Sequence, residues 1–250
     1  MDNRKRSHNK DHHLHHDHHG SACGGDKHDI GHHSCISLVP IFNHLENDQM
    51  DEIMNVTKSL SFKKGEIIYK AGDKSDSLYI VSRGRIKIYH LSENGKEQLF
   101  RILDPGDFTG ELALFKEDVH ETYAEAMVDT NVCTITRQEL QGYLIKYPSI
   151  SLKVLTEFSQ RLATSEKQTA RVATETVETR IALFLVDCVE EGDESLEFKL
   201  PMSKKDLASY LGTTPETISR KFADMEDEGL IRQLPQRRIK ILDLDGLLIL

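Results

Sequence analysis

Apolar and polar residues alternate in short runs across residues 60–136, and glycine separates most of these runs. The alternation is clearest at Leu78 and Ile80 and again at Ile86 and Ile88. A period of two is typical of strands that bury one face. We therefore expect a small antiparallel barrel or roll. Its turns are predicted at Gly65, Gly72, Gly84, Gly106 and the pair Asn94-Gly95, which is a strong hairpin signal.

The pattern becomes helical at Pro148, and the predicted helix runs to about Ala173. Apolar residues recur at spacings of three and four at Leu155, Phe158 and Leu162, which is the spacing of a coiled coil. We interpret this helix as a dimerisation helix, the alternative being a core helix that packs within one subunit. The seam continues through the less apolar positions Ser165, Thr169 and Val172.

Two short helices are predicted close to the C-terminus. Ser203 and Asp206 have the spacing of a capping box at the start of the first helix. Gly212 ends it, because glycine adopts the left-handed conformation that a tight turn needs. Thr214 then caps the second helix, with Pro215 at the first helical position, where a missing N–H costs nothing. Two helices joined in this way predict a helix-turn-helix.

The second of these helices has two distinct faces at about 100° per residue. Its apolar side carries Ile218, Phe222 and Met225. The opposite side carries Glu216, Ser219, Arg220 and Ala223. An arginine can bond to O6 and N7 of guanine, and a glutamate can accept from N4 of cytosine. Because recognition helices place their first residues on base edges, this face predicts reading of the DNA major groove.

The net charge of -9 argues weakly against a nucleic-acid partner, because phosphate neutralisation dominates affinity for DNA. Overall charge says little, however, when the cations gather on one unit. Six basic residues lie in or around the helix-turn-helix, where they are placed for phosphates: Lys204, Lys205, Lys221, Arg237, Arg238 and Lys240. The alternative interpretation is a helical hairpin with a solvated charged face.

The pattern predicts an α+β chain in four segments. These are a His/Cys-rich segment over 1–36 that lacks hydrophobic periodicity, a β-roll over 37–145, a long helix over 146–174, and a winged helix-turn-helix over 175–250. No apolar run approaches the roughly 20 residues of a membrane span. The N-terminus lacks the apolar core of a signal peptide, and the four cysteines do not form a disulfide pattern, so we expect a cytoplasmic protein.

Residues 37–250, with a roll, a long helix and a winged helix-turn-helix in this order, resemble the cyclic-AMP receptor protein / fumarate–nitrate reductase regulator (CRP/FNR) family. The sequence ETISR at 216–220 is similar to the reading element of the fumarate–nitrate reductase regulator branch. The resemblance implies a homodimer that binds a palindrome of TTGAT-like half-sites and works with RNA polymerase. It also implies that Arg220 meets the guanine, Glu216 its paired cytosine, and Ser219 a neighbouring thymine.

Members of this family that bind cyclic nucleotides carry Gly-Glu-Leu, followed about ten residues later by Arg-Ser/Thr-Ala. Here Gly110-Glu111-Leu112 is present, but the later segment begins with Glu121 and Thr122. A carboxylate in place of the arginine would repel a phosphate. We therefore do not expect a cyclic nucleotide as the effector.

Oxygen-sensing members hold a [4Fe–4S] cluster through three clustered N-terminal cysteines and one in the roll. Cys133 lies where the roll cysteine belongs, Cys35 resembles the last of the N-terminal group, and Cys23 is a further candidate. The fourth cysteine of the pattern is missing, since Cys188 lies too far along the chain. The sequence therefore does not supply the four thiolates of the family's cluster pattern.

Three interpretations of the opening segment stay open. Cys23, Cys35 and Cys133, with one of the histidines His28, His32 and His33, could hold an iron–sulfur cluster or a divalent metal. Cys35 and Cys133 could instead form a reversible disulfide. Finally, HHLHHDHH at 12–19 could chelate metal ions loosely without regulating anything. Against the first two, a lone buried cysteine such as Cys133 usually behaves as a small apolar residue.

Two functions of other classes can be compared with a regulator. A metal enzyme built on a small β-barrel needs several histidines that converge from its strands. Residues 60–136 offer only His90 and His120, without His-x-His spacing, and we expect both to be surface residues. A metal-storage protein would leave the helix-turn-helix unexplained. We therefore expect a DNA-binding regulator and no enzymatic activity.

Overall fold

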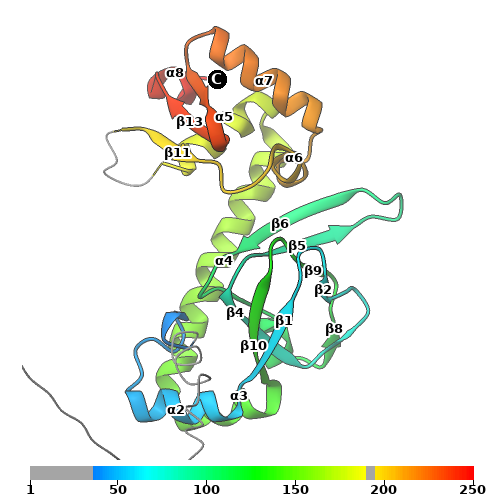
Figure 1. Ribbon diagram of the computed structural model, residues 1–250, viewed down its shortest axis with the longest axis vertical. Coiled ribbons are helices and arrows are strands. Elements are labelled where there is room, and N and C mark those ends of the chain that lie inside the picture. Colours follow the sequence, from blue (N-terminus) through cyan, green and yellow to red (C-terminus); the bar gives the residue numbers. More distant parts are fainter. Residues whose placement is uncertain (1–35, 190–194) are drawn as a thin grey trace, which may run out of the picture.

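The computed structural model describes residues 36–189 and 195–250. Figure 1 shows a β-roll beside one long helix, with a second domain at the far end of that helix. The predicted α+β architecture of roll, long helix and winged helix-turn-helix is confirmed. No described helix has the length and apolarity needed to cross a membrane.

The roll consists of short antiparallel strands, in agreement with the alternation in the sequence. One sheet has the order β1-β10-β4-β7, a second has the order β2-β9-β5-β6, and β3 pairs with β8. The strands are β1 (Lys58–Phe62), β2 (Ile67–Tyr69), β3 (Lys74–Ser75), β4 (Ser77–Arg83), β5 (Ile86–Leu91), β6 (Glu97–Leu103), β7 (Phe108–Thr109), β8 (Asp118–Val119), β9 (Tyr123–Ala126) and β10 (Thr130–Thr136). The short helix η1 (Glu111–Leu114) follows β7.

Helices close one end of the roll. α2 (Asn47–Val56) and α3 (Arg137–Lys146) pack there with the beginning of α4 (Pro148–Thr174). Their shared core is fully buried at Ile53, Leu140 and Ile150. Thr136 starts α3 through a capping box with Glu139, and Pro148 starts α4 at the position where proline is tolerated.

One side of α4 faces its own subunit and another side faces solvent. Ile150 and Val154 are buried against the roll, so part of the core-helix alternative holds for the first turns. On the predicted seam, Leu155 and Leu162 are 59% and 61% exposed, while the ring of Phe158 meets that of Phe115. A soluble helix rarely leaves such a row of leucines uncovered, which agrees with the expected dimerisation seam.

In the residues that the structure describes, the C-terminal domain has four α-helices and a small sheet of order β11-β13-β12. Its elements are α5 (Val177–Asp187), β11 (Glu197–Lys199), α6 (Lys204–Leu211), α7 (Pro215–Asp227), β12 (Ile231–Leu234), η2 (Pro235–Arg237), β13 (Arg238–Ile241) and α8 (Leu244–Leu248). Helices α6 and α7 form the predicted helix-turn-helix, and β12 and β13 form its wing.

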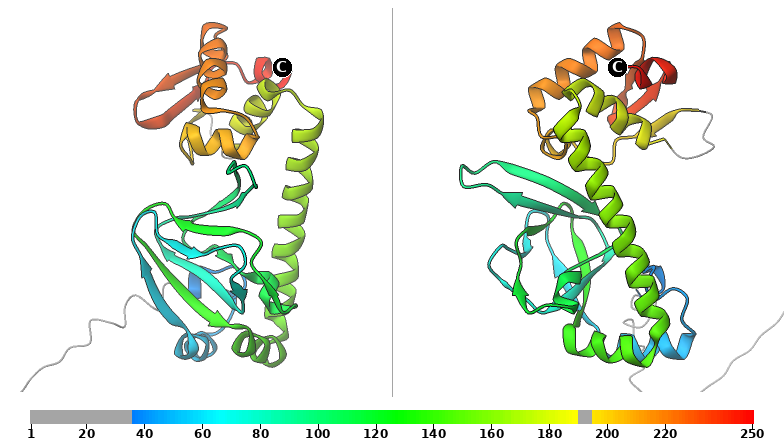
Figure 2. Two further views of the ribbon diagram at one scale, coloured as in Figure 1. Left: turned by 90° about the vertical axis from the view of Figure 1, so that its right-hand side faces the viewer. Right: turned by 180° about the vertical axis from the view of Figure 1, so that it is seen from behind.

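The hairpin of β5 and β6 joins the two domains. Figure 2 shows this blue-green hairpin reaching toward α6. Leu99 of β6 is completely buried in the same apolar cluster as the core of the C-terminal domain. The hydroxyl of Ser209 accepts from the Leu99 N–H and donates to the Glu97 carbonyl, both at 2.8 Å. The roll therefore holds α6 directly as well as through the long helix.

Candidate functional site

The turn between α6 and α7 forms as the sequence predicted. The Ser203 hydroxyl accepts from the Asp206 N–H at 3.1 Å, which satisfies a free donor at the start of α6. Gly212 ends α6 with a φ of 69°, in the left-handed region that glycine adopts without strain. The Thr214 hydroxyl then accepts from the Thr217 N–H at 3.2 Å, with Pro215 first in α7.

α7 presents one face to the core and the other to solvent. Ile218, Phe222 and Met225 are completely buried. The candidate reading residues all lie at the surface, together with the cap residue: Thr214, Glu216, Ser219, Arg220 and Ala223. Because the buried face fixes the rotation of the helix, the side chains of Glu216 and Arg220 are held outward.

The three candidate phosphate-binding lysines have different surroundings. Lys205 is exposed. Lys204 donates to the side-chain oxygen of Gln233 at 2.8 Å and lies over the Phe222 ring, and burial lowers its pKa. Lys221 pairs with Glu178 at 3.1 Å and lies 3.5 Å from Asp224. Lys204 and Lys221 therefore hold protein partners that a phosphate would have to replace.

The wing carries exposed basic side chains at its turn. β12 and β13 meet in a tight turn in which Gln236 and Arg237 both have positive φ, at 60° and 64°. Two successive residues of this kind form the turn that matches the twist of a hairpin. Arg237 and Arg238 are exposed, and Arg238 pairs with Glu197 at 2.7 Å.

A second candidate site surrounds Glu111, between the roll and α4. The carboxylate of Glu111 pairs with Arg101 of β6 and with Arg161 of α4, each at 2.8 Å. Burial alone would raise the pKa of Glu111, but the two guanidinium groups outweigh it and hold that pKa below its usual value. These three residues contribute to a cavity of about 790 Å³ between β6 and α4, which Ser165 and Thr169 also line. The less apolar half of the predicted dimerisation seam of α4 thus faces this cavity.

Of the residues between β8 and β9, one is placed differently from the sequence expectation. Glu121 is exposed, and it is absent from the lining of the cavity among the described residues. His120 was expected at the surface, and that expectation is wrong, since only 7% of it is exposed. Its ring stacks on Tyr69 with 3.7 Å between centroids, and burial lowers its pKa. His90 is exposed as expected.

The candidate metal and redox residues lie mostly outside the described part of the chain. This applies to Cys23, His28, His32, His33 and Cys35. Cys133 is buried in β10, where it lies opposite Ser59 and Ile80. Burial, together with the charge of Asp187, raises the pKa of Cys188 to about 12, which makes its thiol unreactive. Residues 36–189 and 195–250 contain no group of three or more potential metal ligands.

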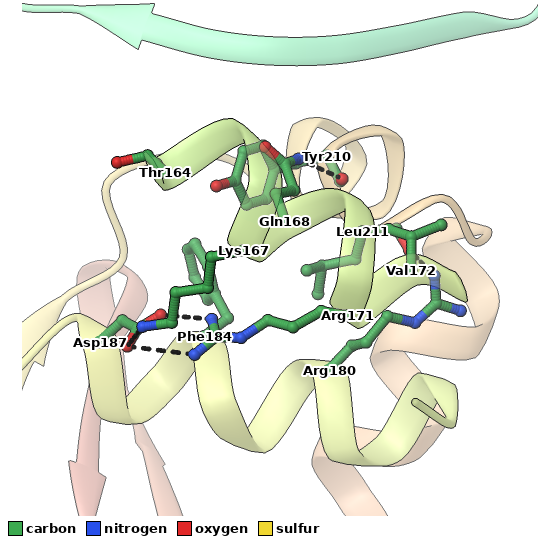
Figure 3. A pocket seen from close by; sticks show the side chains of 10 residues that line it. All are labelled: Thr164, Lys167, Gln168, Arg171, Val172, Arg180, Phe184, Asp187, Tyr210 and Leu211. Atoms are coloured by element: carbon green, nitrogen blue, oxygen red, sulfur yellow. Dashed lines mark hydrogen bonds and ion pairs between the residues drawn. The ribbon is translucent and has the colours of Figure 1, made fainter. Parts of the chain in front are cut away.

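A smaller cavity, of about 250 Å³, lies where α4 meets α5 and α6 (Figure 3). Lys167 and Arg171 of α4 both reach Asp187 of α5, which folds α5 back along α4. Arg180 is buried and donates to the Leu211 carbonyl at 2.6 Å, at the end of α6. These contacts hold α5 of the C-terminal domain against α4 and against the end of α6.

Several of these residues were missed by the sequence analysis. Arg101 and Arg161 lie 60 positions apart and have no local signal of a shared partner. Ser209 lies among ordinary helix residues, and nothing in its neighbours indicates a bond to β6. The Gly-Glu-Leu motif was the one signal that drew attention to Glu111, and it gave no indication of its two arginine partners.

Comparison with known proteins agrees with this arrangement. Residues 59–147 match the family described as the cyclic nucleotide-binding domain, and residues 179–249 match the Crp-like helix-turn-helix domain. The probable transcriptional regulator flp of Lacticaseibacillus casei is 33% identical over 86% of this chain and 97% of its own. The chain belongs to the CRP/FNR family of transcriptional regulators. The Anaerobic regulatory protein of Haemophilus influenzae, 32% identical over 86% of this chain and 82% of its own, is a further relative.

Solved structures agree with the CRP/FNR assignment. FixK2 from Bradyrhizobium japonicum has a TM-score of 0.65 at 26% identity, and the match covers 77% of this chain and 96% of that one. CRP/FNR regulators act by binding DNA and are not enzymes, so the expected absence of enzymatic activity follows from the family.

Proposed function

We propose that the protein is a cytoplasmic homodimer that binds a palindrome of TTGAT-like half-sites and regulates transcription together with RNA polymerase. The observation that carries this proposal is the exposed row of Glu216, Ser219 and Arg220 at the beginning of a capped helix. A carboxylate acceptor, a hydroxyl and a guanidinium in this order suit the base edges of such a half-site.

Support for the dimer comes from the exposed leucines of α4. Two-fold symmetry would place two recognition helices in successive major grooves, centred about 34–36 Å apart. The predicted palindrome follows from that symmetry, since each half-site would meet an identical α7.

The experiment that tests the proposal is a binding titration at several salt concentrations. A labelled TTGAT palindrome is compared with a duplex of the same composition in scrambled order. We expect at least a 1000-fold preference for the palindrome, the lower limit typical of specific DNA-binding proteins, and a steep loss of affinity with salt. Equal affinity for the two duplexes would contradict sequence-specific regulation.

A cyclic nucleotide is not the effector in this proposal. The carboxylate of Glu111, which belongs to the Gly-Glu-Leu motif, is already held by Arg101 and Arg161. Position 121 carries a glutamate where nucleotide-binding members have an arginine. We expect calorimetric titration with cyclic AMP up to millimolar concentration to give no saturable heat, and a micromolar Kd would overturn this part of the proposal.

We further propose that the effector acts through Cys35 and Cys133, either as a disulfide or through a shared metal ion or iron–sulfur cluster. Cys133 belongs to the apolar cluster that also contains Ile36, the residue after Cys35, and Val154 of α4. The described residues supply one ligand, Cys133, so a metal or cluster would take its others from residues before Ile36. A bond between the cysteines would constrain the start of the chain against the helix that orients the DNA-binding domains.

The disulfide form of this switch has a balanced chemistry. Two thiols lose two protons and two electrons, which a peroxide accepts as it is reduced to water. We expect DNA affinity to differ severalfold between reduced and oxidised protein, or between metal-free and metal-loaded protein, within the usual coupling of about 1–3 kcal/mol.

Variants separate the switch from passive metal uptake. Cys35→Ser and Cys133→Ser should each abolish the change in DNA affinity, whereas Cys188→Ser should retain it because the Cys188 thiol stays protonated. Deleting residues 1–22 should remove most loose metal uptake and leave the switch intact. If both cysteine variants respond like the wild type, the opening segment is a passive chelator.

A further inference from the structure

The cavity where α4 meets α5 and α6 carries more positive than negative charge (Figure 3). Among the described residues, its charged lining consists of three cations and one carboxylate: Lys167, Arg171, Arg180 and Asp187. Lys167 and Arg171 lie four positions apart on one face of α4, and both pair with Asp187. One carboxylate balances only one of these two cations, so a positive charge remains before Arg180 is counted.

Arg180 is the buried member of this set. Only 8% of it is exposed, and its guanidinium donates to the neutral carbonyl of Leu211 at 2.6 Å. Its Nε is buried and has no hydrogen-bond partner in the described part of the chain. Figure 3 shows the side chain directed toward Leu211 and away from Asp187. Burying a charge without a counter-ion is costly, and a guanidinium has five N–H donors, so an anionic group suits this side chain.

The size of the cavity limits what it can hold. Its volume of about 250 Å³ lies below the roughly 300–1,000 Å³ of pockets that take drug-sized ligands. The apolar part of the wall comes from Leu211 and from Phe184, whose ring lies 5.8 Å from that of Tyr210. The cavity therefore suits a compact anion rather than a nucleotide.

This cavity differs in charge from the cavity around Glu111. The two share uncharged residues of α4, namely Thr164, Gln168 and Val172. None of the charged residues that line one of them lines the other. Glu111 is already held by two arginines, whereas Arg180 has no such carboxylate beside it among the described residues. The two cavities therefore select different ligands.

We propose that the cavity at α4, α5 and α6 binds a small dianion of the phosphate or dicarboxylate class between Arg171 and Arg180. Both classes offer paired oxygens, which a planar guanidinium binds through two parallel hydrogen bonds. The two negative charges match the difference between three cations and one carboxylate in the lining.

A ligand in this position connects three helices. Arg171 belongs to α4 and Arg180 to α5, and the Leu211 carbonyl that accepts from Arg180 lies at the end of α6. Because a ligand favours the state that it binds, the dianion stabilises this arrangement of α5 and α6 on α4. The cavity is thus an effector site at the junction between the long helix and the C-terminal domain.

The test is calorimetric titration of the full-length protein with inorganic phosphate and, separately, with succinate. The buffer contains no other multivalent anion. We expect saturable binding of at least one of the two, and the one that binds identifies the class of the ligand. The same dianion should raise the unfolding temperature. If neither dianion gives saturable heat at millimolar concentration, the inference is wrong.

Three variants assign the binding to this cavity. Arg180→Gln removes the buried charge and should weaken binding at least about tenfold, the effect of losing one charge-assisted hydrogen bond. Asp187→Asn removes the carboxylate that competes for Lys167 and Arg171, so it should bind the dianion roughly three- to tenfold more tightly. The control Arg83→Gln removes an exposed arginine from the roll and should leave the affinity unchanged.

The gain expected for Asp187→Asn cannot arise from loss of folding, so it decides the test even if Arg180→Gln does not fold. Unchanged or weaker binding by Asp187→Asn would contradict the inference. So would wild-type affinity in a folded Arg180→Gln variant. Equal losses in Arg180→Gln and Arg83→Gln would also overturn it, because the dianion would then respond to overall charge and not to this cavity.

Discussion

Arg220→Ala is expected to weaken binding to a TTGAT-type duplex by about 1–3 kcal/mol and to relax the preference at its guanine. Arg220 is exposed on the outer face of α7, two positions after the completely buried Ile218. Its guanidinium can donate two parallel hydrogen bonds to O6 and N7 of guanine, a pattern that no other base pair offers. The measurement is fluorescence anisotropy with duplexes that carry each base at this position.

The matched control is Lys205→Ala. Lys205 is exposed at the beginning of α6, and as a phosphate contact it should weaken binding to all sequences alike and reduce the salt slope by about one. Lys204 and Lys221 are poorer controls, because their removal also breaks contacts with Gln233 and Glu178. If Arg220→Ala lost affinity equally for every base, as Lys205→Ala should, α7 would not read this position.

The sequence predicts the helix-turn-helix well because the signals that form it are local. Ser203, Gly212 and Thr214 each act on the backbone within a few residues, so their roles can be predicted without knowledge of the rest of the fold. The strands of the roll are predicted for a similar reason, since alternation at residues such as Ile86 and Ile88 reports burial of one face.

The parts that sequence analysis missed depend on distant partners. His120 stands among polar residues, and its burial arises from Tyr69, more than 50 residues earlier in the chain. The charges of Lys204 and Lys221 are visible in the sequence, but their neighbours Gln233 and Glu178 are not. A local pattern reports which groups a segment carries, whereas tertiary packing decides which of them stay available for a ligand.

The contact between the roll and the DNA-binding domain also depends on residues that are far apart in the sequence. Strand β6 makes this contact. Beside the Ser209 bridge, the Gln98 amide donates to the Tyr210 carbonyl at 3.3 Å. Arg85, at the edge of the roll, donates to the Pro201 carbonyl at 2.6 Å. Two residues beyond Leu99, Arg101 pairs with Glu111 in the roll's cavity. One strand thus contacts both the cavity around Glu111 and the helix-turn-helix.

Leu99→Ala should therefore destabilise the junction by about 2–5 kcal/mol, the usual cost of removing a fully buried leucine side chain. Without that side chain, the C-terminal domain loses a fully buried apolar contact with the hairpin, and Tyr89 of β5 is the buried hairpin residue that remains in the shared cluster. We expect calorimetric unfolding to separate into two transitions, with the transition of the C-terminal domain moving to lower temperature.

Phe100→Ala provides the control, because the neighbouring side chain points to the other face of β6 and is 46% exposed. It removes more apolar surface than Leu99→Ala does, but much of that surface is already in contact with water. Its effect on the C-terminal transition should therefore be small, about 1 kcal/mol or less. Equal shifts for the two variants would mean that the hairpin does not hold the DNA-binding domain, and that α4 alone sets its position.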